Sequence, residues 1–286
     1  MMSKVAIITD SIACLTKEQA EHYEIRIVPA NILFEGKVYR DWVDISPSEA
    51  YRLLERAPDQ FTTSPASPTE YLEAYRELSR EAESILCITI SSKLSAFHDM
   101  ARLAKEQAKQ EFPQTTIEVL DSRTATAAQG LIVLAAARAA AEGKSLAGVI
   151  KAAETLIGKV TVIMVMETIR YVYRTGRIPK VAARIGSTLN VKPIITISDG
   201  VVHPAAIART KQRGVDRLLQ MMRDKVGANS VHVAVMHADA LEEAERLKER
   251  VSSEFNCIEL WLSEFSPIMG YATGPGLLGL AFYAEA

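Results

Sequence analysis

The sequence predicts an α/β fold with two domains, and three observations support this. Short apolar, β-branched runs alternate with longer segments of helical spacing, which is typical of a parallel sheet covered by helices on both faces. In the second half, the Asp199-Gly200 turn predicts an antiparallel hairpin and therefore a mixed sheet. The 286 residues, 48% hydrophobic and 24% charged, are enough to bury a core in each of two globular domains.

The N-terminal domain is predicted to span residues 1–158 and to hold the parallel sheet. Apolar runs predict strands, and 3.6-residue spacing predicts helices, such as the face formed by Tyr71, Tyr75 and Leu78. In chain order the predicted strands are 4–9, 25–33, 85–90 and 117–120, and the predicted helices are 47–56, 69–82, 95–111 and 124–142.

The C-terminal domain is predicted to span residues 159–286, after a boundary in the Ala- and Gly-rich helical region around 142–160. Its predicted strands are 160–166, 193–198, 201–208, 231–236 and 257–263, and its predicted helices are 211–226 and 240–254. These elements predict a mixed-sheet α/β unit packed closely on the first domain.

Composition excludes several classes of function and indicates a cytoplasmic protein. The net charge is −2 with no dense basic run, which argues against nucleic acid as a partner. Three scattered cysteines are typical of reduced thiols in a cytoplasm. The first apolar run is too short for a signal peptide, and the run 130–141 is shorter than a membrane span of about 20 residues. Transient membrane contact stays open.

Two clusters of hydroxyls lie where loops are expected to open helices, at 62–67 and 91–95. Helix starts expose unpaired N–H groups and attract anions, so the two clusters together suggest a neutral pocket for a carboxylate or a phosphate. Each hydroxyl also has a simpler interpretation. Thr63 and Ser64 are equally suited to cap the helix that follows them, and Ser92 is suited to cap the next.

Asp10 and Asp121 end two predicted strands, and the carboxyl edge of a parallel sheet is where ligands bind. One hypothesis makes them metal ligands in a phosphoryl-transfer or hydrolytic enzyme. No further acids or histidines with ligand spacing accompany them, so binding to backbone N–H groups of the turns is favoured. No P-loop and no GxGxxG motif follows the first strand, and we expect no cofactor.

Two later segments carry further candidates. Gly176 suits a helix C-cap, and Arg177 beside it is available either to the helix dipole or to an anion between the domains. The segment 270–276 has glycines that expose its backbone, so a role in lining a ligand is plausible beside that of a plain turn.

Taken together, these motifs resemble the DegV family along nearly the whole chain. The matching elements are Thr9-Asp10-Ser11, Thr63-Ser64 with Ser67, Ile90-Ser91-Ser92 with Leu94-Ser95, Asp121-Ser122, Gly176-Arg177-Ile178, Val191-Lys192-Pro193-Ile194 with Gly200, and Thr273-Gly274-Pro275-Gly276. Each element is weak by itself, whereas seven in the same order are specific.

The resemblance implies a two-domain α/β protein that binds one long-chain fatty acid and has no catalytic activity of its own. Members that work with a fatty acid kinase present the carboxylate to a separate ATP-using subunit, which makes an acyl phosphate. It also implies that Thr63 and Ser95 hold the carboxylate and that Arg177 lies near the pocket mouth. The candidate ligand-binding residues are Thr63, Ser64, Ser92, Ser95, Arg177, Tyr271, Ala272, Thr273 and Gly274.

The chain departs from the family pattern in three places. Ala272, with Tyr271 beside it, stands where the family often has a histidine that contacts the carboxylate. Ala96-Phe97-His98 replaces the usual Gly-Thr-Tyr, and the Thr-Ser-x-Pro-Ser loop reads Thr63-Ser64-Pro65-Ala66-Ser67. Losing one charge-assisted hydrogen bond costs about 1.5–3 kcal/mol, so these changes weaken the expectation of a kinase partner more than that of lipid binding.

Overall fold

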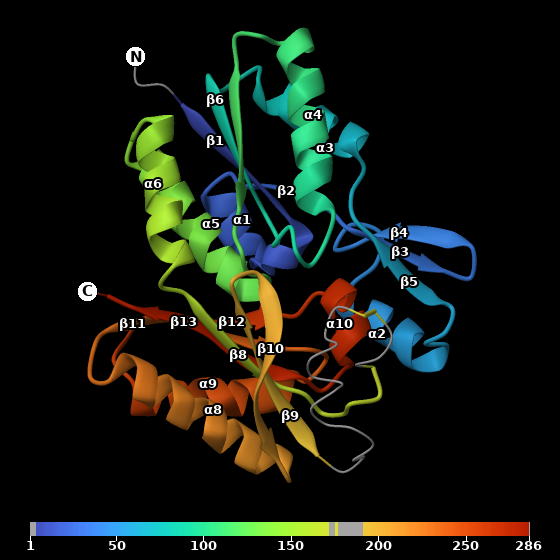
Figure 1. Ribbon diagram of the computed structural model, residues 1–286, viewed down its shortest axis with the longest axis vertical. Helices are drawn as coiled ribbons and strands as arrows, with labels where there is room; N and C mark the ends of the chain where they lie inside the picture. Colours follow the sequence, from blue (N-terminus) through green and yellow to red (C-terminus); the bar gives the residue numbers. More distant parts are fainter. Residues whose placement is uncertain (1–3, 172–174, 177–190, 286) are drawn as a thin grey trace.

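The computed structural model describes residues 4–171, 175–176 and 191–285. It contains three sheets, with strand orders β2-β1-β6-β7, β10-β9-β8-β13-β11-β12 and β4-β3-β5 (Figure 1). The first lies in the N-terminal half, the second in the C-terminal half, and the third beside both. The predicted α/β class, with a parallel sheet and a mixed sheet, is confirmed.

The first sheet is parallel throughout, and crossover connections join its successive strands. Its strands are β1 (Val5–Asp10), β2 (Arg26–Val28), β6 (Ser84–Thr89) and β7 (Thr116–Asp121). The helices of this half are α1 (Lys17–His22), α2 (Pro47–Arg56), α3 (Pro68–Leu78), α4 (Phe97–Glu111), α5 (Thr126–Ala141) and α6 (Leu146–Ile157). Ala6 and Ile8 pack in the core under α3 and α4, whereas Val5 and Ile7 pack under α5 and α6. Alternation along β1 therefore places helices on both faces, as predicted.

The second sheet is mixed, with only β11 and β12 parallel to each other. Its strands are β8 (Thr161–Val165), β9 (Lys192–Ser198), β10 (Val201–Ala208), β11 (Val231–His237), β12 (Cys257–Glu264) and β13 (Leu278–Ala284). The predicted hairpin is confirmed: β9 and β10 pair antiparallel around Asp199 (φ 51°) and Gly200 (φ 78°), both in the left-handed region.

Helices cover one face of the mixed sheet and the N-terminal half covers the other. Ile163 and Val165 pack with α8 (Lys211–Val226) and α9 (Leu241–Glu254). Their neighbour Met164 points the other way, into the largest core cluster, which it shares with Ile8 and other residues of the first sheet. A continuous core thus joins the two halves, and the domain boundary at 158/159 stays a prediction.

The strand predicted at 25–33 is wrong. The single strand expected at 25–33 is divided into β2 and β3 (Asn31–Phe34), which belong to different sheets. Pro29 has no N–H to continue the ladder, and the Ala30 N–H donates to Ser11 Oγ (3.1 Å), so the chain leaves the first sheet there. β3 then pairs antiparallel with β4 (Lys37–Arg40) and β5 (Phe61–Ser64), a sheet that the pattern did not predict.

The sequence interpretation also missed β13, which pairs antiparallel with both β8 and β11 inside the mixed sheet. Gly279 weakens its strand signal, but a Cβ there would lie 2.7 Å from Met164 Cγ, so close packing requires glycine. Within the described residues, no helix combines the length and the apolar character that crossing a bilayer requires.

Candidate functional site

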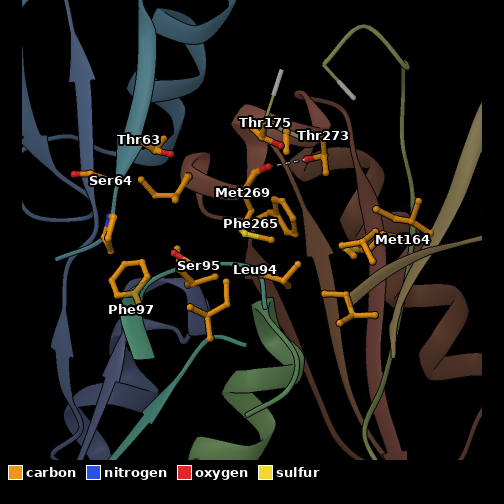
Figure 2. A pocket seen from close by; sticks show the side chains of 18 residues that line it. Thr63, Ser64, Leu94, Ser95, Phe97, Met164, Thr175, Phe265, Met269 and Thr273 are labelled. Atoms are coloured by element: carbon orange, nitrogen blue, oxygen red, sulfur yellow. Dashed lines mark hydrogen bonds between the residues drawn. The ribbon is translucent and has the colours of Figure 1, made fainter. Parts of the chain in front are cut away.

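An apolar pocket lies between the two halves, where β5, the loop after β6 and the mixed sheet converge (Figure 2). From the N-terminal half it is lined by Ile12, Thr63, Ser64, Pro65, Ile90, Leu94, Ser95 and Phe97, and from the C-terminal half by Met164, Thr175, Ile195, Ile197, Val202, Phe265, Ile268, Met269, Ala272 and Thr273. The cavity volume is about 50 Å³. The total empty space between the lining atoms is about 710 Å³, and this space includes a part that is open to the solvent.

Hydroxyl groups gather on one side of this pocket. Figure 2 shows Thr63, Ser64 and Ser95 on the side opposite Met164. Thr63 and Ser64 end strand β5, and Ser95 lies just before α4. The three are partly exposed, and their side-chain oxygens make no hydrogen bond to any described residue. They are therefore available to a ligand.

Thr175 and Thr273 also line the pocket, and the rest of its wall is mainly hydrocarbon. Ile195 and Ile197 point into the pocket from β9, because alternate residues of a strand share a face, and Val202 adds to them from β10. Phe265 and Phe97 contribute aromatic rings from the two halves. The pocket is thus a narrow, mainly apolar space with the three hydroxyls of Thr63, Ser64 and Ser95 at one end.

The alternative interpretation that Thr63, Ser64 and Ser92 cap helices is wrong. Helix α3 is capped by Ser67, whose Oγ accepts from the Glu70 N–H (3.3 Å) while Glu70 completes a capping box. Helix α4 begins at Phe97 after Ala96, with no side-chain cap. Ser92 instead donates its hydroxyl to Asp121 Oδ2 (2.6 Å) and does not line the pocket.

The loop between β6 and α4 joins the two halves through hydrogen bonds to the β9–β10 turn, a contact that the sequence interpretation did not predict. Ser91 Oγ donates to the Gly200 carbonyl (2.9 Å), and Lys93 Nζ donates to the Asp199 carbonyl (2.9 Å). A Cβ on Gly200 would lie 2.4 Å from Ser91 Oγ. The sequence feature that could have predicted this contact is the Asp199-Gly200 turn, because a left-handed glycine without a side chain permits close approach by another segment.

The C-terminal candidates lie on and after α10 (Pro267–Thr273), a short helix that the sequence did not predict. Ala272 and Thr273 line the pocket, and Thr273 Oγ1 donates to the Met269 carbonyl (3.3 Å). Tyr271 packs instead on Phe61, with 5.9 Å between ring centroids. Gly274 (φ 80°) ends the helix; a Cβ there would lie 2.3 Å from Tyr171. Arg177 lies outside the described residues.

The two strand-end aspartates bind backbone N–H groups, as the favoured interpretation predicted. Asp10 accepts from Ile12 N–H (3.1 Å), Ile90 N–H (2.8 Å) and Gln129 Nε2 (3.0 Å). Burial raises the pKa of Asp10 to about 7, although these donors oppose the shift. Asp121 accepts from Arg123 N–H (2.8 Å) as well as from Ser92.

The described residues include no group of three or more His, Cys, Asp or Glu side chains placed to hold a metal ion. The Nδ1 atom of His98 lies 3.2 Å from Thr89 Oγ1. The catalytic alternative therefore gains no support from the geometry around Asp10 and Asp121.

Comparison with known proteins places the chain in a family. The family model described as "Uncharacterised protein, DegV family" matches residues 4–285. A DegV domain-containing protein of Caldanaerobacter subterraneus subsp. tengcongensis is 32% identical over 282 residues, covering 98% of this chain and 99% of its own.

Solved structures share the fold along the whole chain. A DegV family protein from Thermus thermophilus, described with fatty acid binding, has a TM-score of 0.90 and 30% identity, covering 99% of this chain and 100% of its own. A stearic acid-binding protein from Eubacterium ventriosum has a TM-score of 0.91 and 26% identity, covering 99% and 98%. With a family model that spans almost every residue, the conclusion is direct: the chain belongs to the DegV family.

Proposed function

We propose that this protein binds one long-chain fatty acid in the pocket between its two halves. The observation that carries the proposal is an apolar pocket with three hydroxyls at one end that have no partner among the described residues. The related proteins from Thermus thermophilus and Eubacterium ventriosum, which are described as fatty-acid-binding, support the same ligand.

The hydroxyls supply what a carboxylate head group requires. Thr63 and Ser95 each have an O–H to donate, and hydrogen bonds to an ionised acceptor contribute about 1.5–3 kcal/mol. Ser64 lies beside Thr63 and offers a third donor. Ala272 lines the pocket but supplies no donor from its side chain, so the N-terminal hydroxyls bear more of the head-group recognition here.

The apolar walls supply most of the affinity. Each buried methylene gains about 0.8 kcal/mol, so some 15 methylenes offer roughly 12 kcal/mol before entropy costs. A cavity volume of about 50 Å³ holds only a few water molecules, so the tail must displace side chains. Met164 and Met269 line the pocket and are unbranched and adaptable, so we expect them to move.

The second part of the proposal concerns what happens to the bound acid. Thr63, Ser64 and Ser95 are partly exposed, so a carboxylate held there would lie near the surface. We propose that a separate ATP-using kinase reaches it there and transfers the γ-phosphoryl group to a carboxylate oxygen, releasing ADP. In this scheme the chain is the non-catalytic, cytoplasmic lipid-binding subunit and uses no cofactor.

The binding test compares two double variants. Thr63→Ala with Ser95→Ala removes two pocket hydroxyls, whereas Thr62→Ala with Ser92→Ala removes exposed hydroxyls from the same two segments. We expect palmitate affinity, measured by calorimetry on delipidated protein, to fall at least about tenfold in the first and to stay unchanged in the second. Equal affinity in both would remove Thr63 and Ser95 from the site, and failure of the unmodified protein to bind palmitate or oleate would end the proposal.

The kinase test uses chemistry specific to the product. Palmitate-loaded protein is incubated with ATP, Mg²⁺ and a cytosolic extract of the source cells, and hydroxylamine then traps acyl phosphate as a hydroxamate. Hydroxamate formation that depends on the loaded protein supports presentation of the carboxylate. Binding of palmitate without any hydroxamate would leave lipid binding intact and contradict the kinase step.

A further inference from the structure

The wall of the pocket opposite the hydroxyls includes Met164, a buried residue of β8 (Figure 2). Thr63, Ser64 and Ser95 lie on the other side. A fatty acid whose carboxylate lies at these hydroxyls therefore directs its tail toward Met164. The position of the Met164 side chain thus affects how long a tail the pocket can hold.

Met164 is paired across the mixed sheet with residues of both neighbouring strands. On one side its partner is Ile195 of β9, which also lines the pocket. On the other side its partner is Gly279 of β13, and Gly279 is in turn paired with Met236 of β11. Cross-strand partners place their side chains on the same face of a sheet. Gly279 therefore separates two methionines on the face that packs against the N-terminal half.

The backbone does not require glycine at position 279. The φ of Gly279 lies outside the left-handed region, and glycine inside a strand weakens the strand because no side chain packs there. A Cβ would lie 2.7 Å from Met164 Cγ, 2.9 Å from Met236 Cε and 3.1 Å from the Ile163 carbonyl oxygen. Met236 Cε is the end of a flexible side chain and can move, whereas Met164 Cγ lies near the start of its side chain. The missing Cβ therefore leaves space mainly for Met164.

The space above Gly279 is where Met164 can withdraw when a tail enters the pocket. Methionine has three rotatable bonds and adapts its shape at low cost. Movement toward Ile195 keeps the Met164 side chain in the pocket, because Ile195 faces the same space. Movement over Gly279 takes the thioether away from the tail and against β13, where the glycine has no side chain.

We infer, on the basis of the fatty acid site proposed above, that Met164 is the movable end wall of the pocket and that Gly279 sets the longest tail the pocket accepts, by leaving the space into which Met164 withdraws. Met164 is then the residue that determines chain-length specificity. Gly279 acts through Met164 and is a positioning residue.

The experiment measures the affinities of laurate and palmitate by calorimetry on delipidated protein. Gly279→Ala places a Cβ against Met164 Cγ and forces that side chain into the pocket. Each buried methylene contributes about fourfold in affinity, so the loss of room for about two methylenes should weaken palmitate at least about tenfold. Laurate is about four methylenes shorter and ends before the far wall, so its affinity should stay unchanged.

Two further variants separate this role from a general loss of stability. Adding Met164→Ala to Gly279→Ala removes the Cγ that the new Cβ meets, so palmitate affinity should return. Met222→Ala removes an equally large, fully buried side chain from the core on the other face of the mixed sheet. It should lower stability and leave the ratio of palmitate to laurate affinity unchanged.

Met164→Ala alone tests the same inference without a change at Gly279. It deepens the pocket, so the affinity of stearate relative to palmitate should rise at least about fourfold. An unchanged chain-length preference in Met164→Ala, or no return of palmitate binding in the double variant, would overturn the inference and leave fatty acid binding intact. Failure of the unmodified protein to bind either laurate or palmitate would instead refute the proposed site, and the inference with it.

Discussion

Asp10 and the pocket hydroxyls occupy comparable places in the sequence, since all lie at or just beyond strand ends in the N-terminal half, yet the structure uses them differently. Three N–H donors point at Asp10 and occupy its carboxylate. Thr63 and Ser95 have no side-chain hydrogen bond to any described residue. Polar groups that form their hydrogen bonds within the protein stabilise the fold. Polar groups that lie beside a cavity and have no described partner are the ones to test for ligand binding.

The largest expected effect is a loss of stability on replacing Asp10, because three donors depend on its carboxylate. Asp10→Ala leaves the Ile12 N–H, the Ile90 N–H and the Gln129 amide as buried donors without their acceptor. Each such loss costs about 1–3 kcal/mol, so the free energy of unfolding should fall by about 4 kcal/mol. Urea denaturation measures this, and a decrease below about 1 kcal/mol would mean that Asp10 is not a structural anchor.

A somewhat smaller effect concerns the pH dependence of stability. Burial raises the pKa of Asp41 to about 6, above its ordinary value of 3.8. Between these two pH values the folded protein holds a proton that the unfolded chain has released, so this contribution to stability is complete below pH 3.8 and is lost as the pH rises through 6. The loss amounts to about 3 kcal/mol.

Asp41→Asn removes this titration while it keeps an acceptor for the hydroxyls of Ser11 and Ser266, both of which donate to Asp41 Oδ2 (2.8 Å). Stability measured from pH 4 to pH 7 should therefore fall less steeply in the variant than in the unmodified protein. Identical slopes in the two proteins would show that Asp41 does not gain a proton on folding.

The difference between local patterns and distant partners explains how much of the fold and of the site the sequence could predict. Apolar periodicity located most strands and helices, because burial on one face or both leaves a pattern in a single chain. It missed the division at Pro29 and the insertion of β13, since both depend on which distant strand is the partner. For the site, the motif resemblance identified Thr63 and Ser95, which line the pocket, but also Ser92, whose hydroxyl is occupied by Asp121. Hydrogen-bond partners that are distant in sequence leave no local pattern.

A moderate effect is expected where the two halves meet. Gly200→Ala places a Cβ 2.4 Å from Ser91 Oγ at a φ of 78°, so the turn or the Ser91 loop must shift. We expect a loss of about 1–2 kcal/mol in unfolding free energy. Gly36→Ala is the matched control, since it has a φ of 77° but no atom within 4 Å of the added Cβ. Equal losses in both variants would assign the effect to φ alone and not to the contact with Ser91.

The smallest effect on stability is expected at the pocket itself. Thr63→Val keeps the shape and the β-branching of a residue paired with Ile32 in the small sheet, and it removes only a hydroxyl that has no described partner. The free energy of unfolding of the ligand-free protein should change by less than about 0.5 kcal/mol. Palmitate affinity should nevertheless fall about tenfold, because the lost hydroxyl would have donated to the carboxylate. A variant that is destabilised without losing affinity would place Thr63 with Asp10, among the groups that hold the fold, and would erase the difference between the two regions.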